Sequence, residues 1–262
     1  MQEILDLHVY TNNSPCGKDK VSFLCETAVE RGIRAVAFTD ICGIDTIEEL
    51  DTRRRMRHAF YDTAKARQLF FNALSVFSGI EFEQAYQNPA LAAEMMNKRA
   101  YDIVLSAVTA FADQTPFGLD RTTSPAAFAS FARQYAACLL QTVETTDFDV
   151  LSRLLAPLRN LSSDLAVFEE AVKPALRALA EKEKALEVDT VDLLGSERLR
   201  DLYMRLIGFF KDCGGKYLVV GSESKCFDQL GNGIEIACAA VRRTGFDHVC
   251  FYDRRIPYTV EL

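Results

Sequence analysis

The stretch ILDLHVYT, residues 4–11, decides the fold. Its apolar residues predict a short β-strand from Ile4 to Val9, with polar side chains gathered towards the strand's end. An amphipathic stretch of helical period follows, and a second short apolar run, Ala35 to Thr39, comes after it. This alternation is typical of parallel βα units rather than of an antiparallel sheet.

The same alternation continues along the chain and predicts seven strands. They are residues 4–9, 35–39, 76–82, 103–108, 149–151, 186–189 and 217–221. Helix signals lie between them: Ser124-Pro125 combines an N-cap residue with a proline at the first helical position, and Gly214-Gly215 ends a helix that begins near Ser196. A helix over 234–243 and a strand near 249–252 follow. These boundaries fit a closed (β/α) barrel better than an open sheet.

The composition favours a single domain, residues 1–262, in the cytoplasm. Hydrophobic residues make up 49% of the chain, which is enough for one large core. The net charge is −7 and basic residues are scattered among acidic ones, so we expect no face that binds nucleic acid. Acidic residues near the N-terminus exclude a secretion signal, and no apolar run is long enough to span a membrane. We therefore expect neither a nucleic-acid nor a membrane partner.

Polar residues at the strand ends are the candidate functional residues, because chemistry in a parallel barrel gathers where strands end. His8, Glu81 and Glu223 each lie at such an end. Alternate positions at adjacent strand ends point the same way, so these three side chains could share one small cation. They are also consistent with a hydrogen-bonded core histidine and two carboxylates that cap loops.

A series of segments resembles the ordered motifs of PHP-domain histidinol phosphatases. The segments are DLHVYT, AFTDI, GIEFE, DIVLSAVT, DFDVLSRLLAPLR, ALEVDT and VVGSESKCFDQLG. The usual family forms are DxHxHT, TDH, GIE, SVH, DFDVLAH, ALEVNT and GSDAH. The resemblance covers essentially the whole chain, and it implies a distorted seven-stranded (β/α) barrel of PHP type, with a trinuclear metal site that hydrolyses a phosphate monoester.

The chain departs from this family at the metal ligands. The nine ligand positions of the family fall on His8, Tyr10, Cys16, Ile41, Glu81, Thr109, Arg153, Glu223 and Lys225. Only His8 and Glu81 carry the family's residue. The resemblance implies that His8, Glu81 and Glu223 could retain one weakly bound Zn, Mn or Fe ion, or none. We expect the other two sites to be empty, because the guanidinium of Arg153 and the ammonium of Lys225 repel a cation.

Three basic residues near the strand ends allow two interpretations. Arg153 and Lys225 replace family ligands, and Arg159 corresponds to a family arginine that could bind substrate phosphate. These cations could pair with carboxylates left over from the metal site, or they could bind a small phosphorylated or other anionic ligand. In either case we expect Arg153 to lie within salt-bridge reach of a strand-end carboxylate.

The eight cysteines include no CxxC pair, so we expect no disulfide framework in this large domain. Cys16, Cys42 and Cys226 lie just beyond strand ends, where ordinary packing is the favoured reading. A replacement metal site built on thiolates is the alternative.

These observations predict a degenerate PHP-domain protein with weak or no hydrolysis and a binding or regulatory role, because the family's metals activate water and clamp the phosphoryl oxygens. The alternative is a working histidinol-phosphatase-like phosphoesterase with a reduced metal site. A thiol-based or unrelated enzyme on the same barrel is a third reading. In each case we expect six side chains to converge at one end of the barrel, namely His8, Ile41, Glu81, Thr109, Arg153 and Glu223.

Overall fold

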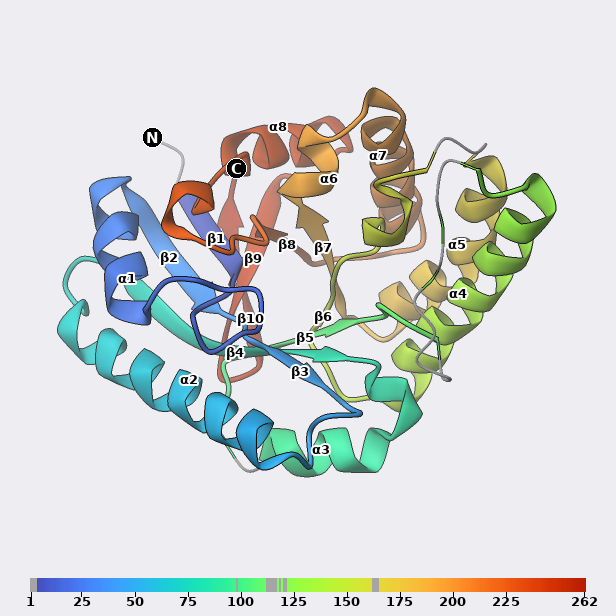
Figure 1. The fold of residues 1–262 in the computed structure, drawn as a ribbon. Helices are drawn as coiled ribbons and strands as arrows, with labels where there is room; N and C mark the ends of the chain where they lie inside the picture. Colours follow the sequence, from blue (N-terminus) through green and yellow to red (C-terminus); the bar gives the residue numbers. More distant parts are fainter. Residues whose placement is uncertain (1–3, 98, 112–116, 118, 120–121, 162–164) are drawn as a thin grey trace.

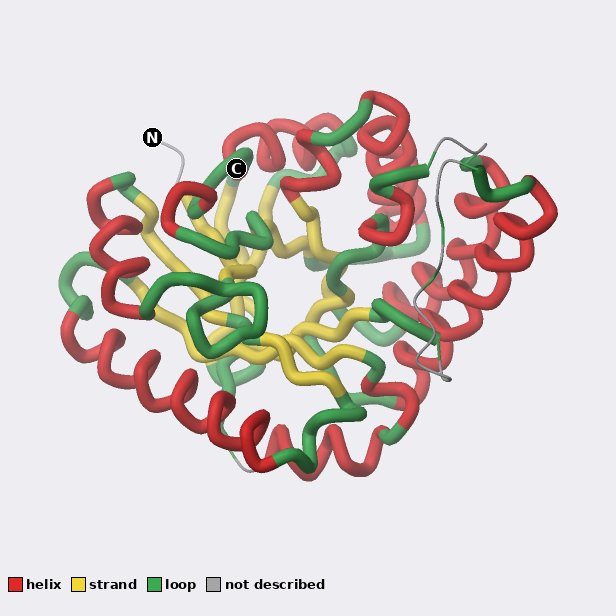
Figure 2. The backbone as a smooth tube through the Cα atoms, in the orientation of Figure 1, coloured by secondary structure: helices red, strands yellow, loops and turns green. Residues whose placement is uncertain are grey.

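Seven parallel strands curve into a nearly closed barrel in the computed structural model, and helices surround it (Figure 1 and Figure 2). The structure describes residues 4–97, 99–111, 117, 119, 122–161 and 165–262. In order of hydrogen-bonded neighbours, the barrel strands are β1 (Ile4–Val9), β2 (Ile33–Phe38), β4 (Ser75–Glu83), β5 (Ile103–Ala107), β6 (Val150–Leu151), β7 (Ala185–Asp189) and β8 (Leu218–Gly221). The predicted seven-stranded barrel is confirmed.

The chain after β8 returns to β1 and seals the barrel at its carboxyl end. The Tyr10 amide donates to the Ser224 carbonyl at 2.9 Å, and the Ser224 amide donates to the His8 carbonyl at 3.3 Å. Gly221 lies at this contact, where a Cβ atom would stand 2.3 Å from the Cβ of His8. Glycine therefore permits the close approach of β8 to β1, and this approach brings the residues after β8 next to His8.

Helices cover the outer face of the barrel (Figure 1). They are α1 (Val21–Glu30), α2 (Leu50–Leu69), α3 (Pro89–Asn97), α4 (Pro125–Thr145), α5 (Ala166–Glu181), α6 (Thr190–Leu194), α7 (Glu197–Asp212) and α8 (Ile234–Arg243), with short turns η1 (Ala85–Gln87), η2 (Ala156–Leu158) and η3 (Phe227–Gln229). The predicted N-cap of α4 is confirmed, since Ser124 Oγ accepts from the Ala127 amide at 3.2 Å. None of the helices in the described ranges is long and apolar enough to cross a membrane.

Two strands were not predicted from the sequence. β3 (Ile41–Gly43) pairs with β4 beyond the end of β2, and its three residues are too few to show a periodicity. The predicted terminal strand is confirmed as β9 (His248–Asp253), but it pairs with an antiparallel strand, β10 (Ile256–Glu261), that the prediction missed. The turn between them places Arg254 and Arg255 at φ angles of 51° and 66°, a conformation that Asn-Gly usually signals.

Candidate functional site

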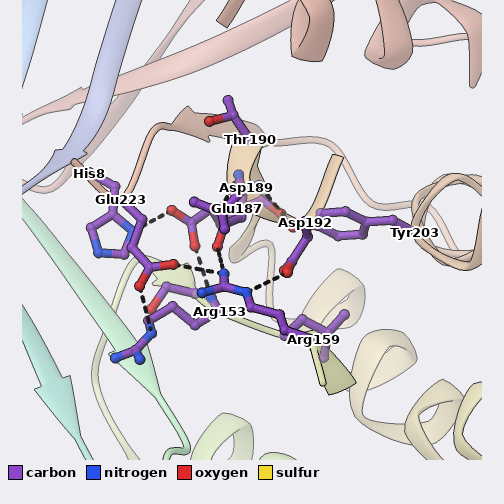
Figure 3. Close-up of polar contacts among 12 residues, drawn as sticks. His8, Arg153, Arg159, Glu187, Asp189, Thr190, Asp192, Tyr203 and Glu223 are labelled. Carbon is purple, nitrogen blue, oxygen red and sulfur yellow. Dashed lines mark hydrogen bonds and ion pairs between the residues drawn. The ribbon is translucent and has the colours of Figure 1, made fainter. Parts of the chain in front are cut away.

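A cluster of charged side chains lies at the carboxyl ends of the barrel strands (Figure 3). This mouth cluster comprises His8, Glu81, Glu83, Arg153, Arg159, Glu187, Asp189, Asp192 and Glu223. The carboxylates recur every second residue along β4 and β7, since residues two apart in a strand face the same way. Parallel topology thus gathers at one place residues that are far apart in the sequence.

Buried hydrogen bonds use both ring nitrogens of His8. Nδ1 lies 2.5 Å from Glu187 Oε1, and Nε2 lies 2.8 Å from the Tyr10 hydroxyl. That hydroxyl in turn donates to Glu81 Oε2 at 2.7 Å. Burial alone lowers the pKa of His8, but Glu187 and Glu81 together raise this pKa well above its ordinary value. His8 is therefore a charged, hydrogen-bonded residue of the interior in this structure.

Replacing Tyr10 by phenylalanine tests this chain of hydrogen bonds. The ring still fills its buried space, but His8 Nε2 and Glu81 Oε2 both lose their phenol partner. We expect Tyr10→Phe to lower the free energy of unfolding by about 1–3 kcal/mol, as measured by urea denaturation. Tyr135→Phe is the matched control, because among the described residues the Tyr135 hydroxyl bonds only the Leu154 carbonyl, at 3.1 Å. Equal losses in the two variants would contradict the special role of Tyr10.

Arg153 lies among three carboxylates. Its Nη1 is 2.9 Å from Glu83 Oε1 and 3.7 Å from Glu81 Oε2, while its Nε is 3.7 Å from Glu223 Oε1. Only 17% of the side chain is exposed. The prediction that Arg153 lies within salt-bridge reach of a strand-end carboxylate is confirmed. Of the two interpretations offered for this residue, the structure shows the pairing with carboxylates.

The backbone at the mouth adopts an unfavourable conformation at two of these charged residues. Arg153 and Glu223 have φ angles of 56° and 50°, in the left-handed region that favours glycine. The Arg153 amide donates to Glu187 Oε2 at 2.9 Å, which helps to hold this conformation. Burial tends to raise the pKa of Glu223, but Arg153 and Arg159 lower it to about 2. The strained backbone thus places a guanidinium beside a carboxylate that stays ionised.

Arg159 forms a second set of ion pairs beside the first (Figure 3). Its Nη2 contacts Asp189 Oδ2 at 2.6 Å and Glu223 Oε2 at 2.7 Å, and its Nε contacts Asp192 Oδ1 at 2.7 Å. Lys225 Nζ lies 3.5 Å from Glu223 Oε1, with 43% of its side chain exposed. Next to these residues lies a cavity of about 300 Å³, whose lining includes Arg159, Thr190, Ser222, Glu223, Lys225 and Asn232. Lys225 is thus the most exposed of the three predicted anion-binding cations.

The other altered ligand positions also lie at this end of the barrel. Ile41 in β3 stands opposite Glu81 in β4. Thr109, after β5, exchanges hydrogen bonds with the Gln84 side chain at 2.9 and 2.6 Å. The structure therefore places at one mouth all six residues that we expected to converge.

Three cysteines lie near the mouth, and burial raises the thiol pKa of two of them, Cys16 and Cys42. Burial raises the pKa of Cys16, although Lys225 and Arg153 act in the opposite direction. Burial also raises the pKa of Cys42 to about 12. Cys226 is only partly buried and follows the end of β8. The burial of Cys42 and the partial burial of Cys16 are consistent with the packing interpretation.

Sequence reasoning did not single out four residues at the mouth: two are members of the mouth cluster, Glu83 and Asp192, and two bond to its members, Ser152 and Tyr203. Glu83 pairs with Arg153, and Ser152 Oγ donates to Glu81 Oε1 at 2.7 Å. Asp192 pairs with Arg159, and the Tyr203 hydroxyl donates to the Glu187 carbonyl at 2.5 Å. Glu83 had a usable signal, because it follows Glu81 by two residues on one strand face. The others lie in a loop or in helices, where no periodicity pointed to the mouth.

In this structure neighbouring side chains engage the candidate metal ligands. Within the part of the chain that the structure describes, no three His, Cys, Asp or Glu side chains are placed so that they could hold a metal ion together. The chemistry of the donors gives the reason, since His8 has committed both nitrogens and Arg153 lies 3.7 Å from both Glu81 and Glu223. A guanidinium stays protonated and repels a cation.

A family model described as the PHP domain matches residues 6–191. The chain belongs to the PHP domain family. The match begins within β1 and ends in α6, so it contains part of β1 and all of β2 to β7, but not β8. The sequence resemblance to this family is thereby confirmed.

Known PHP relatives include histidinol phosphatases. A histidinol-phosphatase from Lactococcus lactis is 22% identical over 260 residues, which cover 95% of this chain and 94% of that protein. A probable histidinol-phosphatase from Thermotoga maritima is 26% identical over 131 residues, 50% of this chain and 55% of that protein. The match therefore spans only about half of the Thermotoga protein.

Solved structures share the fold of this PHP domain. The crystal structure of histidinol phosphate phosphatase from Lactococcus lactis, in complex with zinc, L-histidinol and phosphate, superposes with a TM-score of 0.86 at 21% identity and covers 98% of this chain and 100% of that one. A putative histidinol phosphatase from Listeria monocytogenes superposes with a TM-score of 0.68 at 13% identity, over 88% of this chain and 99% of that one. At these identities the likeness shows the fold alone.

Proposed function

We propose that this histidinol-phosphatase-like PHP protein is a degenerate member of its family, with weak or no hydrolysis and a binding or regulatory role in the cytoplasm. The observation that carries the proposal is the position of Arg153 among Glu81, Glu83 and Glu223. A fixed cation there neutralises the carboxylates, but it can neither lower the pKa of a bound water nor exchange ligands during phosphoryl transfer. Arg153 thus supplies the positive charge that a metal would supply, but it does not supply the metal's water activation or phosphoryl coordination.

The ligand that fits this proposal is a small phosphorylated or other anionic molecule. Arg153 and Arg159 are already paired with carboxylates, so Lys225 carries the charge that is most available to a ligand. It lines the cavity together with the polar side chains of Ser222 and Thr190. The related Lactococcus structure contains L-histidinol and phosphate, which supports a ligand of this size.

The second candidate is a metal-dependent phosphoesterase with one reduced site on His8, Glu81 and Glu223. Two observations favour it: His8 Nε2 lies 3.5 Å from Glu81 Oε1, and Glu223 Oε1 is buried without a hydrogen-bond donor among the described residues. A bound Zn, Mn or Fe ion would supply an activated water. To hold the ion, His8 would have to release Tyr10, and Arg153 would have to leave the carboxylates.

Metal content and turnover distinguish the two candidates. We expect protein purified without chelators to contain well under one equivalent of Zn, Mn or Fe and to hydrolyse L-histidinol phosphate at close to the background rate, with no gain on adding these metals. The Lactococcus histidinol phosphate phosphatase, assayed beside it, is the positive control. About one bound equivalent or more, together with metal-dependent turnover, would overturn the proposal and establish the second candidate.

A further inference from the structure

The outer face of α2 combines large exposed apolar side chains with cations that form no ion pair in the part of the chain that the structure describes. The helix contains six Lys and Arg residues but only two Asp residues, in a chain whose net charge is −7. Its buried positions are Thr52, Met56, Ala59, Thr63 and Ala66. Figure 1 shows α2 on the outside of the barrel, and the residues on the opposite face of the helix are exposed to solvent. The even scatter of charge expected from the sequence does not hold at this helix.

One stripe along this face carries both kinds of side chain. Its members follow one another at helical spacing: Leu50, Arg54, Arg57, His58, Tyr61, Lys65 and Leu69. The three apolar members are strongly exposed, with 84% for Leu50, 58% for Tyr61 and 75% for Leu69. We call these seven residues the α2 stripe. A stripe of this composition on a globular surface calls for a partner that offers both negative charge and an apolar layer.

The cations of the α2 stripe are free to meet such a partner. Arg54, Arg57 and Lys65 form no ion pair with any other residue in the described ranges, whereas Arg55 is paired with Asp51 and Arg67 with Asp102. The two Asp residues of the helix, Asp51 and Asp62, lie along one flank of the stripe.

We propose that the α2 stripe docks this protein on an anionic lipid surface. The helix would lie flat in the interface, with Leu50, Tyr61 and Leu69 entering the headgroup region and with Arg54, Arg57 and Lys65 contacting acidic headgroups. This peripheral contact goes beyond the proposed function and does not depend on it. It also differs from the expectation of no membrane partner, which rested on the lack of a spanning segment and on scattered charge.

The spacing of the stripe favours a bilayer over the other anionic partners. Leu50 and Leu69 are about 28 Å apart along the helix axis, with Tyr61 between them. A partner protein usually anchors on a compact apolar patch, and these three side chains do not form one. Leucine can neither neutralise a phosphate nor stack on a base, so it adds nothing to nucleic-acid binding. A planar lipid surface can contact all three apolar residues at the same time.

Vesicle sedimentation with the full chain tests the proposal. We expect binding to phosphatidylcholine vesicles that contain about 30% phosphatidylserine, weak binding to pure phosphatidylcholine, and loss of binding at high salt. The triple variant Arg54→Gln/Arg57→Gln/Lys65→Gln should lose about five-fold in affinity per charge, on the order of a hundred-fold in all. The proposal would be overturned if the wild-type protein bound neither kind of vesicle.

Two further variants make the test specific. Arg200→Gln/Arg242→Gln/Arg243→Gln removes three exposed cations from α7 and α8, so it makes the same charge change elsewhere and should retain vesicle binding. Leu50→Ser/Tyr61→Ser/Leu69→Ser keeps every cation and should still lose binding. The proposal would be overturned if the α7/α8 variant lost as much vesicle binding as the α2 cation variant. It would also be overturned if the wild type bound a labelled single-stranded RNA tightly and the serine variant bound that RNA equally well. Circular dichroism of each variant checks that the fold is intact.

Discussion

Restoring all seven altered ligand positions together is expected to raise both metal content and phosphatase activity, the latter on the order of 10³-fold or more. The set consists of Tyr10→His, Cys16→Asp, Ile41→His, Thr109→His, Arg153→His, Glu223→Asp and Lys225→His. Tyr10→His alone should leave both quantities close to the wild-type level. Groups that act as one catalytic unit are strongly non-additive, so one restored ligand supplies neither an activated water nor a clamp on the phosphoryl group.

The comparison needs wild type, the single variant and the full set, purified with one metal supply and assayed side by side on L-histidinol phosphate. A third variant, with the six changes other than Arg153→His, isolates the effect of the guanidinium. It should bind little metal, because Arg153 would still lie beside Glu81 and Glu83. Brisk metal-dependent hydrolysis by the wild type would show that His8, Glu81 and Glu223 suffice, and a folded full set without metal would refute the ligand assignment.

The barrel was predictable because its strands carry a local signal. Apolar runs separated by amphipathic stretches specify parallel βα units, and the motif order added the family. β3 and β10 lacked such a signal. β3 depends on pairing with residues 81–83 of β4, beyond the end of β2. The β9–β10 turn uses Arg254 and Arg255 in a conformation that is usually signalled by Asn-Gly. Both strands are set by tertiary contacts rather than by local pattern.

The charges at the mouth were only partly predictable. The prediction that Arg153 pairs with a carboxylate follows from the cost of burying unpaired charge, which does not depend on exact geometry. Which partners His8 takes depends on distances of tenths of an ångström, and its bond to Glu187 joins residues 179 positions apart. The sequence therefore left both roles of His8 open. The α2 stripe was missed because the order of residues in the sequence does not by itself show which side of a helix is exposed.

Loss of the Arg153 side-chain charge is expected to destabilise the protein by about 3–5 kcal/mol in Arg153→Met. The variant keeps side-chain bulk and a Cβ atom, so the backbone strain at φ 56° is the same before and after the change. What changes is the neutralisation of Glu81, Glu83 and Glu223, whose carboxylates would remain close together without a counter-charge. Urea denaturation at neutral pH measures the difference in unfolding free energy.

A double-mutant cycle with Glu83→Gln assigns this loss to the ion pairs. Glu83 makes the shortest contact with Arg153, at 2.9 Å, and its removal also relieves repulsion from Glu81 once the arginine is gone. The double variant should therefore be more stable than the sum of the single losses predicts, by about 1–3 kcal/mol. Arg205→Met is the matched control, because Arg205 is half exposed and pairs with Glu169 at the surface, where we expect a loss of no more than about 1 kcal/mol. If Arg153→Met costs no more than Arg205→Met, then the mouth cluster does not hold the barrel together, and the proposal that internal ion pairs take the place of the metals loses its energetic basis.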